Sequence, residues 1–374
     1  MSVEIGGRVA PGLERLVEAF AANFTRGDDY EEVGAALVVM REGERIVDLW
    51  AGSADAARTR PWTSETLVNV WSTTKGAAAL CVAWAVGRGF LAYDQKVAEL
   101  WPEFAAAGKG AITVAEAMSH QAGLPGWAET TTLDDLEDWD LVCGRLAAQA
   151  PVFAPGTANS YHAATYGFLA GEILRRATGR TLGRILAEEL VGGADFFIGL
   201  PRAEDARVAE LLAPRSPVDV SAMPLTEPAR MALFNPEQDP GRPNRPSFRR
   251  AEMPALNGQA SARGVCAVYD LIAMGGKSRV AAGAIDRMCA IAADRDDLML
   301  GFNPQWGMGV AHNLIGVYGP NPATVGHSGW GGSFGCADRD RRLSIGYVCN
   351  QMGSELVGDP RGAGLAAAVY EALG

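Results

Sequence analysis

The hydrophobic and polar positions along the chain change their period several times. Residues 11–25 place apolar side chains at helical spacing after a proline suited to a first turn, which predicts an early helix. Residues 34–52 form two strand-like apolar runs around a Glu-Gly turn, which predicts a hairpin. An alanine-rich run that starts at Ser72 and ends at two glycines predicts a buried helix.

The end of the chain returns to a strand pattern. Residues 331–350 alternate as strand, Asp/Arg-rich turn and strand, and residues 362–373 have the composition of a closing helix. Strands at both ends with helices between them predict an α/β (α+β) fold of two subdomains. We expect an antiparallel sheet that is built from the N- and C-terminal strands and flanked by helices.

These patterns also predict where the subdomains divide. We expect the α/β subdomain to comprise residues 1–78 and 280–374, and a mainly helical subdomain to be inserted as residues 79–279. Residues 234–262 are dense in proline, arginine, asparagine and glycine. A loop of this length in a compact enzyme is more often a lid or pocket wall than a linker.

Composition and charge narrow the classes of function. The 374 residues are 48% hydrophobic and 21% charged, as in ordinary globular enzymes, and the net charge of −11 disfavours nucleic-acid and membrane partners. The six cysteines lie far apart, and the N-terminus has no signal-peptide pattern, so we expect reduced thiols and a cytoplasmic location. No metal-binding motif is present, and we expect no cofactor.

Two serines lie in patterns typical of nucleophiles. Ser333 lies in a Gly-x-Ser-x-Gly sequence, which in a hydrolase elbow needs a following helix and a later histidine as base. A turn and a strand pattern follow Ser333, and all four histidines precede it, so we interpret it as a strand residue at a close backbone approach. Ser72 and Lys75 form Ser-x-x-Lys at the start of the alanine-rich helix, where both side chains share one face. A desolvated lysine can act as a base, unlike arginine, and the helix N-terminus favours an oxyanion.

Four ordered blocks resemble one family. They read WSTTKG at 71–76, ITVAEAMSHQAGLPGW at 112–127, PGTANSYHAATYGFLAGEIL at 155–174 and GHSGWGGSFG at 326–335. In order and spacing they resemble the serine β-lactamase and penicillin-binding-protein superfamily. The likeness is closest to the class C β-lactamase-like branch that includes the family VIII carboxylesterases, and it covers roughly residues 30–180 and 255–374.

The resemblance implies a role for each matched position. Ser72 resembles the acylated nucleophile, Lys75 its neighbouring base, and Tyr161 the tyrosine that exchanges protons with the lysine. The backbone N–H groups of Ser72 and Trp330 would form the oxyanion hole. Substrate-binding positions would be the third-motif strand and two aromatic side chains: His327, Ser328, Gly329, Trp127 and Phe334.

Two departures from the class C pattern bear on the substrate. The second motif reads Tyr161-His162-Ala163, so the asparagine that holds the acyl side chain of a β-lactam is absent. The third motif begins with His327 in place of lysine, and a histidine is largely neutral near pH 7. Both changes favour neutral esters over substrates that carry a carboxylate.

The sequence therefore predicts a serine carboxylesterase that hydrolyses short-chain esters through an acyl-enzyme on Ser72. One alternative is a β-lactamase or D-amino-acid peptidase activity of the same fold, weak or promiscuous. A second alternative is a catalytically silent homologue that binds a ligand. The partner we expect is a small-molecule ester, and the oligomeric state is left open.

Overall fold

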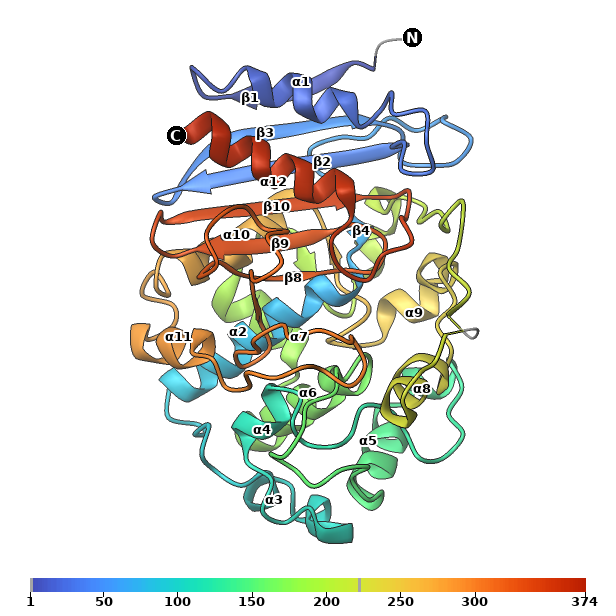
Figure 1. The fold of residues 1–374 in the computed structure, drawn as a ribbon, viewed down its shortest axis with the longest axis vertical. Helices are drawn as coiled ribbons and strands as arrows, with labels where there is room; N and C mark the ends of the chain where they lie inside the picture. The colour runs from blue at the N-terminus through green and yellow to red at the C-terminus, as the bar shows by residue number, and fades with distance from the viewer. Residues whose placement is uncertain (1–2, 221–222) are drawn as a thin grey trace.

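A computed structural model describes residues 3–220 and 223–374 (Figure 1). Its main feature is a seven-stranded antiparallel sheet in the order β1-β3-β2-β10-β9-β8-β7. The central pairing joins strands from opposite ends of the chain, with Val39 opposite Ile345. The strands are β1 (Ile5–Val9), β3 (Glu44–Gly52), β2 (Gly34–Arg41), β10 (Leu343–Cys349), β9 (Phe334–Asp338), β8 (Val325–Ser328) and β7 (Ala311–His312). The predicted hairpin and the predicted two-ended sheet are both confirmed.

The sheet is buried on both faces. In β2, Leu37 and Val39 face one apolar core and Ala36 and Val38 face the other, because successive strand residues point to opposite sides. The first face is covered by the two terminal helices, α1 (Arg15–Ala22) and α12 (Pro360–Leu373), which lie side by side in Figure 1. The early helix expected in residues 11–25 is therefore confirmed as α1.

The second face is covered by α10 (Ala262–Ala273), which the sequence assigned to the helical subdomain. Two strand glycines explain why this helix lies on the sheet. A side chain at Gly346 would lie 2.6 Å from the Cys266 nitrogen, and one at Gly335 would lie 2.1 Å from the Tyr269 ring. α10 therefore packs on the sheet although it precedes residue 280, and the division into subdomains at residue 279 stays a prediction.

The alanine-rich helix is α2 (Thr74–Gly87), and its residues from Thr74 to Ala85 are all buried. It lies between the sheet layer and the mainly helical part of the molecule (Figure 1). The helices around and below it are α3 (Val97–Leu100), α4 (Val114–Met118), α5 (Trp139–Ala148), α6 (Thr165–Thr178), α7 (Leu182–Ile185), α8 (Glu227–Phe234), α9 (Pro246–Arg250) and α11 (Ala282–Cys289). A small three-stranded sheet joins β4 (Val68–Asn69), β6 (Gln259–Ala260) and β5 (Phe196–Phe197).

The segment expected to form a lid-like loop, residues 234–262, contains α9 and is tied to the helical part. Arg242 is buried and forms ion pairs with Asp134 and Glu137. Phe248 is also buried and packs edge-on against Trp71, 6.2 Å between ring centroids. The segment therefore supports the turn that carries Ser72. No helix within 3–220 or 223–374 combines the length and apolar character needed to cross a bilayer.

Candidate active site

Ser72 lies in a tight turn between β4 and α2. The residue before it, Trp71, has a φ of 43°, and the Trp71 N–H donates to Asn69 Oδ1 at 3.0 Å. This turn leaves Ser72 partly accessible while its neighbours Trp71 and Thr73 are buried. The hydroxyl therefore faces the pocket at the positive end of a helix.

Lys75 is fully buried one turn further on. Its Nζ lies 2.9 Å from Ser72 Oγ, 2.7 Å from the Ala163 carbonyl oxygen and 3.2 Å from the Ala255 carbonyl oxygen. Desolvation lowers the Lys75 pKa well below its usual value of 10.5. A neutral amine has two N–H groups, which can donate hydrogen bonds to the two carbonyl oxygens. Its lone pair then faces the Ser72 hydroxyl. The contacts suit a lysine that accepts the serine proton.

Tyr161 is the third residue of the group that contains Ser72 and Lys75. Its ring centroid lies 4.7 Å from Lys75 Nζ, and the ring stacks on Trp306 at 5.7 Å and 7°. Burial raises the Tyr161 pKa, while a hydrogen bond with the Ser72 side chain opposes that shift. A tyrosine held protonated beside Ser72 can give a proton to a leaving group. Ser72, Lys75 and Tyr161 are thus brought together as the sequence predicts.

Asp297 holds Tyr161 in place, and the sequence analysis missed it. Its Oδ1 accepts the Tyr161 N–H at 2.9 Å, and its Oδ2 accepts the Trp306 indole N–H at 3.0 Å and the Asn159 amide at 3.1 Å. The carboxylate is buried, and it also accepts the N–H groups of Met299 and Leu300. One side chain therefore joins the tyrosine to the aromatic ring on which it stacks.

Replacing Asp297 with alanine is expected to lower both stability and turnover. Several buried donors lose their acceptor, at about 1–3 kcal/mol for each donor left unpaired, so the free energy of unfolding should fall by about 3 kcal/mol or more. The released tyrosine should also lower kcat for a nitrophenyl ester. Urea unfolding and steady-state kinetics measure the two effects. The exposed neighbour Asp296→Ala is the matched control, and equal results for the two variants would contradict the role given to Asp297.

The third motif forms the wall opposite Tyr161. His327 and Ser328 end β8, and both line the pocket that contains Ser72. The His327 ring lies 5.9 Å from the Tyr161 ring, and burial lowers its pKa to about 3. His327 is therefore neutral at pH 7, and the positive charge that a lysine would supply at this position is absent.

Ser333 connects the same wall to the serine turn through its side chain. Its buried hydroxyl donates to the Val70 carbonyl oxygen at 2.9 Å and lies 3.1 Å from Thr73 Oγ1. A side chain at Gly329 would lie only 2.2 Å from that same Val70 oxygen, so this wall and the serine turn are in close backbone contact. Strand β9 follows Ser333, as the sequence predicts. The Ser333 hydroxyl is already engaged in its hydrogen bond with the Val70 carbonyl oxygen.

Two backbone N–H groups at the site, those of Ser72 and Trp330, have no hydrogen-bond partner among the described residues. The N–H groups on either side of Ser72 and of Trp330 are hydrogen-bonded, including those of Thr73, Gly329 and Gly331. In the described ranges no hydrogen bond is formed by the N–H of Ser72 or of Trp330 themselves. Free donors at these two positions suit an oxyanion hole, the role that the resemblance implies.

Hydrogen bonds from several segments fix the turn that carries Trp330. The Gly331 N–H donates to the Glu355 carbonyl oxygen at 3.2 Å. The Gly331 carbonyl oxygen accepts from Arg361 Nη2 and from the Gly353 N–H, both at 2.9 Å. Arg361 is at the start of α12, so the first turn of this helix contacts the turn that carries Trp330.

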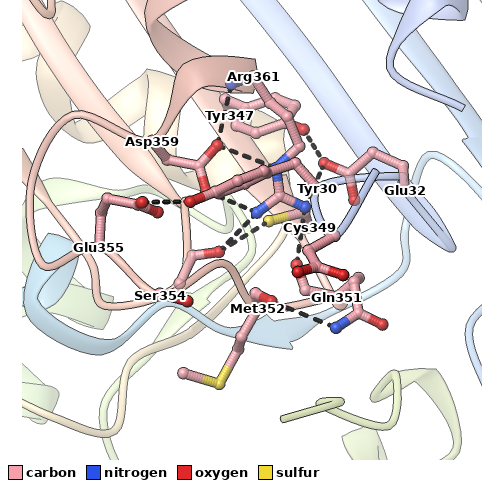
Figure 2. A network of polar contacts seen from close by, with 12 residues as sticks. Tyr30, Glu32, Tyr347, Cys349, Gln351, Met352, Ser354, Glu355, Asp359 and Arg361 are labelled. Carbon is pink, nitrogen blue, oxygen red and sulfur yellow. Dashed lines mark hydrogen bonds and ion pairs between the residues drawn. The ribbon is translucent and has the colours of Figure 1, made fainter. Parts of the chain in front are cut away.

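A buried network of charges surrounds Arg361 (Figure 2). The guanidinium forms ion pairs with Asp359 at 2.7 Å and Glu32 at 3.1 Å, and it donates to the Gln351 carbonyl oxygen at 2.8 Å. The Tyr347 hydroxyl donates to Glu32. The arginine and Glu32 side chains have no exposed surface, so removing Arg361 would leave the buried carboxyl groups of Asp359 and Glu32 without their cation.

The network gives the protein a defined pH dependence of stability. Burial raises the pKa of Glu32 from 4.5 to about 7, although Arg361 opposes the shift. The folded protein therefore holds this proton more tightly than the unfolded chain does. The Glu32 contribution to the free energy of unfolding is complete below about pH 4.5 and is lost as the pH rises to about 7, by about 3 kcal/mol.

A Glu32→Gln variant cannot titrate at this position. We expect its free energy of unfolding to decline less than that of the wild type between pH 5 and pH 8, measured by urea unfolding at several pH values. The exposed Glu18→Gln variant should keep the wild-type slope. Parallel slopes for wild type and Glu32→Gln would contradict the prediction.

The pocket around Ser72 and Tyr161 has apolar walls. None of the described residues that line it is a lysine, arginine, aspartate or glutamate. Burial lowers the pKa of both lining histidines, His312 and His327, so they are uncharged at neutral pH. The apolar lining residues include Leu300, Phe302, Trp306, Ile315, Val317 and Leu356.

Two aromatic side chains expected at the substrate lie elsewhere. Trp127 is buried in the helical core against Phe168, with its indole N–H on the Val142 carbonyl oxygen. Phe334 is buried beneath the pocket and stacks on Tyr318. Neither lines the pocket of Ser72, and Trp306 provides the aromatic wall instead.

His120 and His162 support the loop before Tyr161. The Leu124 N–H donates to His162 Nε2 at 3.2 Å, and the His162 N–H donates to His120 Nδ1 at 3.1 Å. Burial lowers the pKa of both imidazoles, to about 4 for His162. The side chain that follows Tyr161 therefore faces the protein interior and holds a loop.

Comparisons with known proteins agree on one family. The family model described as Beta-lactamase matches residues 13–368. Esterase/beta-lactamase LipL of Mycobacterium tuberculosis is 32% identical over 94% of this chain and 84% of its own length. Esterase EstB of Burkholderia gladioli is 30% identical over 85% of this chain and 86% of its own length. A solved family VIII carboxylesterase is 45% identical, with a TM-score of 0.93 over 99% of this chain and 100% of that chain.

Proposed function

This chain belongs to the beta-lactamase family, and on that premise we propose that it is a serine carboxylesterase that acts through an acyl-enzyme on Ser72. The observation that carries the proposal is the contact of the fully buried Lys75 Nζ with Ser72 Oγ at 2.9 Å. The esterase names of similar proteins support the same class of reaction.

The geometry supports a two-step reaction. Neutral Lys75 takes the Ser72 proton as Oγ attacks the ester carbonyl carbon, and the N–H groups of Ser72 and Trp330 stabilise the oxyanion. Tyr161 gives a proton to the departing alkoxide, which leaves as the alcohol. Water then attacks the acyl-enzyme by the same proton path and releases the carboxylic acid.

The walls of the pocket support a neutral ester as substrate. A substrate carboxylate would find no cation among the lining residues, and His327 and His312 are uncharged at neutral pH. Ala163 supplies only its carbonyl oxygen, which Lys75 already uses. We therefore propose uncharged carboxylic esters, with the short acyl chains that the family resemblance implies.

We also propose that the protein works in the cytoplasm. All six cysteines are buried free thiols, which is typical of proteins that fold in a reducing compartment.

Labelling with a fluorophosphonate, followed by peptide mass spectrometry, tests the assignment of the nucleophile. We expect one adduct, on the peptide that contains Ser72, and loss of ester turnover in proportion to labelling. An adduct on Ser333, or full activity after complete labelling of Ser72, would overturn the proposal.

A β-lactamase activity is the second candidate, because the name of LipL includes it. Turnover of a nitrophenyl ester and a chromogenic cephalosporin, measured side by side, separates the two functions. We expect kcat/KM to be higher for the ester, since the pocket offers no charge for the cephalosporin carboxylate. The opposite ratio would favour the β-lactamase.

A further inference from the structure

Exposed apolar side chains gather at the mouth of the Ser72 pocket. Ile315 and Leu356 are 52% and 38% exposed, and both line the pocket. Leu314 and Leu298 are 44% and 37% exposed and lie one and two residues from the lining residues Ile315 and Leu300. We call these four residues the apolar rim. Single exposed apolar residues are common on proteins, but here two of them line one pocket and two more lie within two residues of its lining.

Hydrogen bonds hold the segments of the rim in place. The Leu298 N–H donates to the Asn159 carbonyl oxygen at 2.9 Å, and the Thr226 hydroxyl donates to the Leu298 carbonyl oxygen at 2.7 Å. Leu356 follows Glu355, whose carbonyl oxygen accepts the Gly331 N–H. The rim is therefore built on the same elements that position Tyr161 and Trp330.

The rim continues the apolar wall of the pocket outward. The same pocket is lined by Trp306, which stacks on Tyr161, by the apolar residues Leu300 and Val317, and by the exposed Ile315 and Leu356. The enclosed part of the pocket is small, about 40 Å³, so a hydrocarbon group longer than a short acyl chain has to extend outward past it, toward Ile315 and Leu356. A short ester would fill the bottom of the pocket and leave the rim in water.

We propose that the apolar rim binds a hydrocarbon group of the ester, so that the preferred substrates carry a large apolar acyl or alcohol group. The inference rests on the proposed ester hydrolysis at Ser72, because it assigns the rim to the same substrate. It extends the short-chain esters implied by the family resemblance toward longer and bulkier ones. The lining favours this occupant, since among the described residues it contains no lysine, arginine, aspartate or glutamate that could pair with a charged group.

The test compares chain-length series in wild type and two double variants. One series is nitrophenyl esters from acetate to octanoate, and the other is acetate esters of increasingly long alcohols, all below their micelle concentrations. The rim variant is Ile315→Ser with Leu356→Ser. The control is Phe90→Ser with Leu141→Ser, which replaces two exposed apolar residues, one beyond the far end of α2 and one on α5.

In the wild type, kcat/KM should rise with chain length in at least one series, by up to about fourfold for each methylene that leaves water. The series that rises identifies the acyl or the alcohol group as the one at the rim. The rim variant should lose about tenfold on the longest ester and less than about threefold on the acetate. The control variant should keep the wild-type profile.

Three outcomes would overturn the inference. They are a flat wild-type profile in both series, an equal loss on short and long esters in the rim variant, and an equal loss in the control variant. Each of these can occur while acetate turnover still depends on Ser72, so they reject the rim and leave the proposed function intact. Absence of any Ser72-dependent turnover rejects the proposed function itself.

Discussion

Ser72→Ala is expected to lower kcat for ester hydrolysis by about four to six orders of magnitude. The alanine removes the only atom that can form the acyl-enzyme, while the oxyanion donors and the pocket stay in place. The remaining activity should therefore be the slow attack of water on the bound ester, assisted only by the oxyanion donors and the pocket. Burst kinetics with a nitrophenyl ester should also disappear, since no acyl-enzyme accumulates.

The matched control for this prediction is Ser278→Ala. Ser278 is exposed and lies in the turn after α10, away from the pocket lining. Its kcat should stay within about twofold of the wild type, as is usual for a surface change. If folded Ser72→Ala kept more than a few per cent of wild-type turnover, another nucleophile would have to be at work.

Lys75→Arg is expected to lower kcat/KM by about 10²- to 10⁴-fold, the contribution typical of a general base. Arginine keeps a positive charge at all accessible pH values, so it cannot take the Ser72 proton. The wild-type rate should fall as the pH drops through the lowered Lys75 pKa, because the protonated amine has no lone pair. This acidic limb should lie well below pH 10.5 and should vanish in the variant.

Lys96→Arg is the corresponding control, because Lys96 is exposed at the start of α3. Its pH–rate profile should overlay that of the wild type. An unchanged acidic limb in Lys75→Arg would assign that limb to a group other than the lysine, and the proposed base would be wrong.

The parts of the site that depend on local spacing could be predicted from the sequence. Ser72 and Lys75 are one helical turn apart, and the alanine-rich run after them predicts the helix that brings them together. The hairpin of residues 34–52 was equally predictable, since its alternation of apolar positions is local. Tyr161 and His327 could be assigned only through the family resemblance, because nothing near them in the sequence indicates that they meet Ser72.

The parts that depend on long-range packing could not be predicted. Asp297 lies in the acidic run DRDD, which has the composition of a surface loop, and only the fold makes it the buried acceptor of the Tyr161 N–H. Trp127 and Trp306 are equally hydrophobic in the sequence. Which of them faces the substrate depends on tertiary contacts, and the structure assigns Trp306 to the wall.

Packing also explains why the sequence could not place α10 on the sheet. The amphipathic residues of α10 are compatible with any apolar partner, so the sequence could not assign the helix to one layer. Gly335 and Gly346 provide that information, because they leave room on the sheet for a helix. A glycine in a strand can therefore mark a helix contact as well as a bulge.

The pairing of β2 with β10 has a consequence for how the protein is made in the cell. Val39 pairs with Ile345, so 305 residues must be synthesised between these two positions of the central ladder. At 5–20 residues per second, translation takes about 15–60 s to cover that interval. Throughout this time the apolar edge of β2 that pairs with β10 has no partner strand, although β3 and β1 are already made. We therefore expect newly made protein to depend on ribosome-associated chaperones, and activity to appear only after the C-terminal strands have left the ribosome.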